Sequence, residues 1–234
     1  MTVLSAVQNA CTEALSLAKP DTLFGSTRRD MVELQSIANA AAEYIARDHD
    51  WEFLKTKATI TGNGTSEDFP LPDDYDRMLV KAGLWSSRLS APLLHVEDSD
   101  RWLGIEVQGD MSAFGAWTMY QSRIHILPAP ALSETVQYFY ISNNIVRITV
   151  SDGVYSYTNT FTIDEQSFAL SETLLKLAIV WMYKASKGRE YAEDMATYER
   201  EKEKLVARDG GSKIIHVGRT RLPGAEFAYP LSVG

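Results

Sequence analysis

The chain has 234 residues, of which 45% are hydrophobic and 23% are charged, and its formal net charge at pH 7 is −8. This is the composition of a globular protein with enough chain for a substantial core, and its acidic balance argues against a surface that grips nucleic acid through phosphate contacts. The single cysteine excludes an intrachain disulfide, no apolar run reaches the roughly 18 residues that a membrane span needs, and the first residues lack the basic region of a signal peptide.

Two helices are predicted at the start of the chain. Small and aliphatic residues recur at helical spacing over residues 2–19, and Pro20 is expected to stop this first helix. A second helix with the same periodicity is expected to begin at residues 27–30, which resemble a capping box, and to end near Asp48. Cys11 falls on the apolar face of the first helix and is predicted to be a small core residue.

After His49 the pattern changes to that of short strands. Residues 55–61 alternate polar and apolar side chains, as a half-buried strand does, and residues 117–120 and 123–127 are predicted to form a hairpin. Short strands at this spacing predict a small sandwich or a barrel-like sheet. Further strands are expected at 77–85, 135–142, 145–150 and 158–163, an extended edge at 69–72, and one helical turn at 98–103.

The strongest helical signal lies in residues 170–209. Ser171 is a good N-cap and Gly188 is the residue type that a helix end prefers, so we expect two helices joined by a short connection. The first of them is apolar on more than one side, which predicts burial at the centre of a bundle or at a subunit contact. Its predicted core residues are Leu174, Ala178, Trp181, Met182 and Ala185.

Together these elements predict an α+β fold. An antiparallel helical bundle is expected from residues 1–50 and 168–209, because helices joined by short connections pack as antiparallel neighbours. Residues 51–167 are then an inserted antiparallel β domain, and residues 210–234 form an extended C-terminal arm.

The arm carries three basic residues and one acidic residue, five glycines and two prolines, and it has no helical period. A disordered tail is usually poorer in aromatic and aliphatic residues. Either the arm orders on a partner, for example by adding a strand, or it packs back on its own domain. Its candidate interface residues are Ile214, Ile215, Val217, Arg219, Arg221, Leu222, Phe227, Tyr229 and Leu231.

Residues that could carry catalysis or bind a metal are few. The four histidines are not at metal-site spacing, and one cysteine cannot build a thiolate site. General acid–base chemistry needs two carboxylates in unlike environments, whereas the pairs Asp73/Asp74 and Asp98/Asp100 lie in turn-like contexts where aspartate bonds to backbone. We therefore predict no catalytic residue, no metal and no cofactor, with a carboxylate-dependent hydrolase as an alternative.

Several loose patterns follow one another in a familiar order over residues 38–209. They are NAAAEYIARDHDW at 39–51, FPLPDDY at 69–75 with Arg77 after it, Trp85, IHILP at 124–128, and the apolar helix at 170–191 followed by a charged one. This order resembles the head-to-tail adaptor (connector) proteins of tailed bacteriophages, in particular the group like tail tubular protein A. Residues 98–115 match no element of that pattern.

The resemblance implies a structural protein of the virion at the head–tail junction, assembled in the host cytoplasm. Its copies, twelve in number, would form a ring beneath the portal protein, attach the tail (nozzle or tail-tube) protein, and continue the channel through which genomic DNA passes without sequence-specific binding. The arm would bind the portal, and no cofactor or membrane is implied. Another tail, baseplate or fibre-attachment protein is the alternative within the same structural class.

Overall fold

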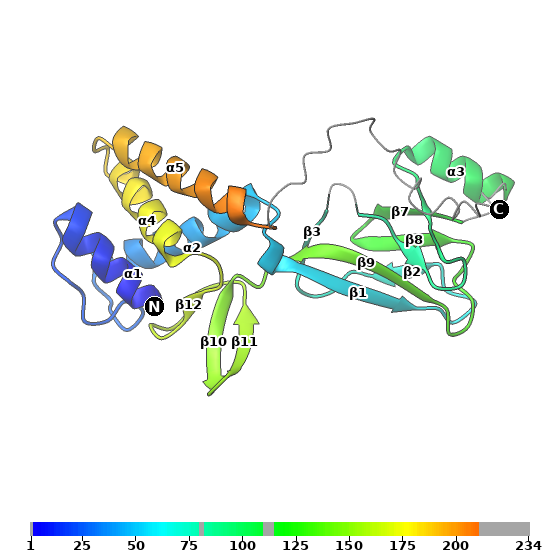
Figure 1. Cartoon of the computed structure of the whole chain (residues 1–234), viewed down its shortest axis with the longest axis horizontal. Helices are drawn as coiled ribbons and strands as arrows, with labels where there is room; N and C mark the ends of the chain where they lie inside the picture. The colour runs from blue at the N-terminus through cyan, green and yellow to red at the C-terminus, as the bar shows by residue number, and fades with distance from the viewer. Residues whose placement is uncertain (1, 80–81, 110–114, 211–234) are drawn as a thin grey trace, which may run out of the picture.

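The computed structural model describes residues 2–79, 82–109 and 115–210. Figure 1 shows an elongated molecule with helices α1, α2, α4 and α5 at one end and a β region with helix α3 at the other. Helices and antiparallel sheets in one chain agree with the predicted α+β class. No helix in the described ranges is long and apolar enough to cross a membrane.

Helix α1 (Val3–Ala10) is capped by Thr2, whose hydroxyl accepts from the Ser5 backbone N–H at 3.3 Å. It continues as a π-helical turn, η1 (Cys11–Leu15), and the chain then leaves the helix at Ser16. The prediction that this helix reaches Lys19 was therefore wrong. Ser16 adopts the left-handed conformation with φ 56°, which ends the helix before Pro20 can.

Helix α2 (Arg29–Asp48) ends at Asp48, as predicted. The predicted capping box at its start is absent, because Arg28 occupies the cap position and makes no side-chain cap hydrogen bond. Asp30 instead accepts from the guanidinium of Arg28 at 2.6 Å. The alanines of α2 that face the interior, among them Ala38, Ala41 and Ala42, are buried.

Helix α4 (Glu172–Ser186) begins at the predicted cap, where the Ser171 hydroxyl accepts from the Leu174 N–H at 3.3 Å. Gly188 follows its end with φ 63°, and α5 (Ala192–Arg208) begins after the expected short connection. Helix α4 contacts α1, α2 and α5, and one continuous apolar cluster runs through all four. We call these four helices the helical region; their arrangement as an antiparallel bundle stays a prediction.

The β region contains two sheets. One places β1 (Lys55–Thr61), β9 (Thr135–Ser142), β4 (Trp85–Ser86) and β5 (Ala91–Pro92) in that order, and β3 (Tyr75–Met78) also pairs with β9. The other has the order β2 (Asp68–Pro70), β8 (Arg123–Leu127), β7 (Ala116–Tyr120) and β6 (Leu94–His95). Buried residues of both sheets form one cluster, so their apolar faces pack together as a small sandwich.

Strands β1 and β9 and the β7–β8 hairpin occur where they were predicted. Among the described strand pairings, only β6 with β7 is parallel, which departs from the predicted antiparallel domain. The single strand expected at 77–85 is replaced by β3 and β4, which lie at different positions along β9. The helical turn expected at 98–103 is the longer helix α3 (Ser99–Gln108), which Asp98 caps through the N–H groups of Asp100 and Arg101.

A third, small sheet holds β10 (Val146–Ser151), β11 (Val154–Thr158) and β12 (Ser167–Phe168). The prediction of a strand at 158–163 was wrong. The turn at Asp152-Gly153 reverses the chain direction, so β11 begins at Val154 and ends at Thr158. Val146 and Phe168 of this sheet, with Phe161 from the connection between β11 and β12, pack on the helical region. Figure 1 shows β10 and β11 extending from one side of the molecule between its two ends.

Candidate interaction surfaces

Arg77 joins the two ends of the molecule. Its guanidinium, carried by β3, donates to the carbonyl oxygens of Ala46 at 3.3 Å and His49 at 2.9 Å, at the C-terminal end of α2. It also donates to Asp50 at 3.0 Å and Asp76 at 2.6 Å. A cation at this end of a helix satisfies free carbonyls and complements the helix dipole. Arg77 therefore fixes the sandwich to the end of α2.

Asp74 belongs to the same segment and is fully engaged. Its carboxylate accepts from the hydroxyls of Tyr140 at 2.6 Å and Ser142 at 2.7 Å, and from the Asn144 side-chain amide at 3.2 Å. Burial, followed by the hydrogen bond to Asp74, raises the pKa of Tyr140. Asp74 therefore ties this segment to β9, and Arg77 ties it to the end of α2.

Asp98 and His125 also have structural partners. Asp98 caps α3, and Asp100 lies in its first turn. His125, buried in β8, lies with Nδ1 2.5 Å from an Asp68 carboxylate oxygen. Within the described ranges, no group of three or more His, Cys, Asp or Glu side chains could hold a metal ion.

The end of α5 is tied to the connection between the two regions. Asp209 accepts from the Glu52 backbone N–H at 2.9 Å and lies 3.4 Å from Nε2 of His49. Glu52 begins the 3-10 turn η2 (Glu52–Leu54), which leads directly into β1. The described chain therefore reaches Gly210 beside the start of the sandwich.

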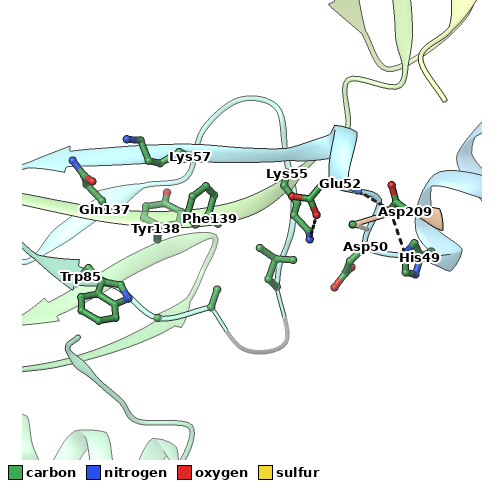
Figure 2. Close-up of a pocket in the computed structure, with 14 residues that line it drawn as sticks. His49, Asp50, Glu52, Lys55, Lys57, Trp85, Gln137, Tyr138, Phe139 and Asp209 are labelled. Carbon is green, nitrogen blue, oxygen red and sulfur yellow. Dashed lines mark hydrogen bonds and ion pairs between the residues drawn. The ribbon is translucent and has the colours of Figure 1, made fainter. Parts of the chain in front are cut away.

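A cleft of about 660 Å³ opens at this connection. We call it the waist cleft; Figure 2 shows Trp85, Tyr138, Phe139 and Lys57 on the β side and His49 and Asp209 on the helical side. Its lining is mostly apolar, because Leu79, Trp85 and Phe139 contribute to it. Lys55 pairs with Glu52 at 2.5 Å, whereas Lys57 forms no ion pair within the described part of the chain.

The β10–β11 hairpin exposes apolar and aromatic side chains. Val150 is 64% exposed, Val154 53% and Tyr155 46%. The guanidinium of Arg147 lies over the Tyr155 ring at 5.0 Å, and Tyr157 lies beside Phe53 with ring centroids 6.0 Å apart. This surface was not predicted, because the strand was expected at 158–163, although the alternation in VYSYT after the Asp152-Gly153 turn is a signal of β11.

The predicted core residues of α4 are buried to different degrees. Leu174 and Ala178 are fully buried, whereas Trp181, Met182 and Ala185 are half-buried. Trp181 lies against an aromatic group, with ring centroids 5.8 Å from Tyr44 and 6.2 Å from Tyr198. The predicted arm residues, 214–231, lie outside the described residues.

Asp74 and Asp98 thus make structural contacts, and the waist cleft and the β10–β11 hairpin are exposed at the surface. The sequence matches the model of the SU10 adaptor protein family over residues 1–219, and the chain belongs to this family of phage head-to-tail adaptors. No curated protein matches the sequence. Membership points to a non-enzymatic component of the virion that associates with portal and tail proteins. The narrower likeness to tail tubular protein A stays a prediction.

Proposed function

We propose that this protein forms a ring of twelve copies beneath the portal, where it joins head to tail and continues the channel for genomic DNA. The family match over residues 1–219 is the observation that carries the proposal. The net charge of −8 supports the channel role, because an acidic wall binds the DNA backbone weakly and lets it pass.

We further propose that residues 210–234 are the arm that binds the portal. The arm starts at the waist cleft, beside Asp209, and it carries apolar anchors such as Phe227, Tyr229 and Leu231 between glycines and prolines. A segment with anchors but no core of its own gains order on a partner surface. On this proposal the sandwich faces the tail protein.

The test is binding to the portal ring, followed by native mass spectrometry and electron microscopy. The full chain is compared with a chain that ends at Asp209 and with a full-length variant in which Phe227, Tyr229 and Leu231 are changed to serine. We expect the full chain to form a ring on the portal and both variants to lose it. A ring that forms equally well without the arm contradicts the arm's role but leaves the adaptor role standing.

If the full chain does not bind the portal at all, the proposal of a portal-bound ring fails. The alternative, a tail, baseplate or fibre-attachment protein, then predicts binding to tail-side proteins in the same assay. A carboxylate-dependent hydrolase predicts release of soluble sugars from cell-wall polymers, abolished by one carboxylate variant that still folds.

A further inference from the structure

We propose that the β10–β11 hairpin of one copy inserts into the waist cleft of the next copy, and that this contact builds the ring. The inference rests on the proposed ring and goes beyond it by naming the two surfaces that meet. Apart from Gly210, the first residue of the arm, which lines the cleft, neither surface belongs to the arm, so the contact between copies is separate from the proposed contact with the portal.

The hairpin has the properties of an inserting element. It extends away from the body of the molecule (Figure 1), and Val150, Val154, Tyr155 and Tyr157 are all exposed on it. Exposed apolar side chains gathered in one place mark an interaction site. At the tip, Asp152 forms no ion pair within the described part of the chain.

The waist cleft has matching properties. It is open and mostly apolar, and its aromatic lining is only partly covered, since Phe139 remains 53% exposed. Lys57, on β1, is exposed at its edge without a carboxylate partner among the described residues. An unpaired carboxylate on the hairpin and an unpaired ammonium group at the cleft are complementary charges, which fix the register of an interface.

The two surfaces lie on different sides of the same chain. In Figure 1 the hairpin extends from one side of the molecule, whereas the end of α5, which borders the cleft, lies on the other. The hairpin of a chain therefore cannot fill the cleft of the same chain. A contact between unlike surfaces of identical copies is head-to-tail, and such contacts close into rings when the rotation between copies is suitable. The favoured occupant of the cleft is therefore a second copy of this chain.

Cysteine cross-linking tests the contact directly. The variant carrying both Asp152→Cys and Lys57→Cys is assembled on the portal and treated with a short bifunctional thiol reagent. Cys11 is the only native cysteine and is 0% exposed, so it does not interfere. We expect a ladder of covalent oligomers from the double variant and only dimers from a mixture of the two single variants. A matched control pairs Lys57→Cys with Val107→Cys, an exposed site on α3, and should give no ladder.

Charge reversal supplies a second test. Asp152→Lys or Lys57→Glu alone should weaken assembly by roughly tenfold, and the two together should restore much of it, because the reversed charges attract again. Rings that form on the portal without any cross-link between positions 152 and 57 would overturn the hairpin contact and leave the ring intact. If the unmodified chain forms no ring, the ring and this contact are both overturned.

Discussion

The helical region and the sandwich are stabilised in different ways. The helical region has one continuous apolar core, and the ion pairs around it, such as Lys176 with Glu13, lie near the surface. The sandwich has a smaller apolar core and also buries polar groups, among them Glu134 and His125. The comparison indicates that the helical region depends mainly on buried area, whereas the sandwich also depends on buried hydrogen bonds and on pH.

Glu134 is a buried polar group of the sandwich, and no local pattern in the sequence predicts its burial. Its side chain is 4% exposed. It accepts from the Ser86 hydroxyl, from Nε of Arg88 at 2.8 Å and from the Ala131 N–H at 2.8 Å. Burial acts to raise the pKa of Glu134, but the hydrogen bonds from Ser86, Arg88 and Ala131 outweigh it and hold that pKa below its usual value.

The largest effect is expected from Leu174→Ala in the helical region. Leu174 is fully buried where α4 meets the shared core, so removing its side chain leaves a cavity and should lower the free energy of unfolding by about 2–5 kcal/mol. Chemical denaturation measures this loss. Cys11 lies in the same core and should react faster with a thiol reagent in the variant, because opening of this region exposes it.

The control for that experiment is Leu103→Ala on α3, where the side chain is 54% exposed. Its free energy of unfolding should stay within about 0.5 kcal/mol of the native value. If Leu103→Ala lowered the free energy of unfolding as much as Leu174→Ala, buried apolar area in the helical region would not explain the loss.

Glu134→Ala should have the next largest effect, about 1–3 kcal/mol, because it leaves the buried Ser86 hydroxyl and the Ala131 N–H without their acceptor. Glu134 and these partners lie in the sandwich, so the destabilisation should be confined to that region. Hydrogen exchange should therefore speed up in β4 and β9, while thiol labelling of Cys11 stays at the native rate. Faster Cys11 labelling in this variant would show that the two regions open together and would remove the distinction.

The pH dependence of stability should follow the same division. Because the folded-state pKa of Glu134 lies below its unfolded value of 4.5, the carboxylate stabilises the fold fully above that pH and loses this contribution as pH falls through the folded pKa. The difference in unfolding free energy between the native chain and Glu134→Gln should therefore shrink between about pH 6 and about pH 3. Leu174→Ala removes no titrating group, so the difference in unfolding free energy between this variant and the native chain should stay constant over that pH range.

The smallest effect on stability is expected from Tyr155→Ser on the hairpin. Tyr155 is 46% exposed, so the free energy of unfolding should change by no more than about 0.5 kcal/mol. Ring assembly on the portal, followed by electron microscopy, should nevertheless weaken, because the side chain belongs to the proposed contact. Thermal melting checks the first expectation, and a large loss of stability would instead place Tyr155 among the groups that hold the fold.

Prediction from sequence succeeded where the signal is local. Helix α2 and strands β1 and β9 were predicted within a residue or so of their bounds, because apolar periodicity reports which face of a segment is buried. The cap at Ser171 is also a local feature. The predicted end of the first helix was wrong, because no local sequence signal distinguishes a left-handed Ser16 from one more helical residue.

What the sequence by itself determined is the α+β class, most of the long elements and the likeness to phage adaptors. Only the tertiary structure decided that Arg77 caps α2 from 28 residues away, that Glu134 meets Ser86 across 48 residues, and that the cleft and the hairpin lie on different sides. The physical reason is that secondary structure depends on neighbours a few residues apart, whereas buried polar pairs and docking surfaces exist only after distant segments have packed together.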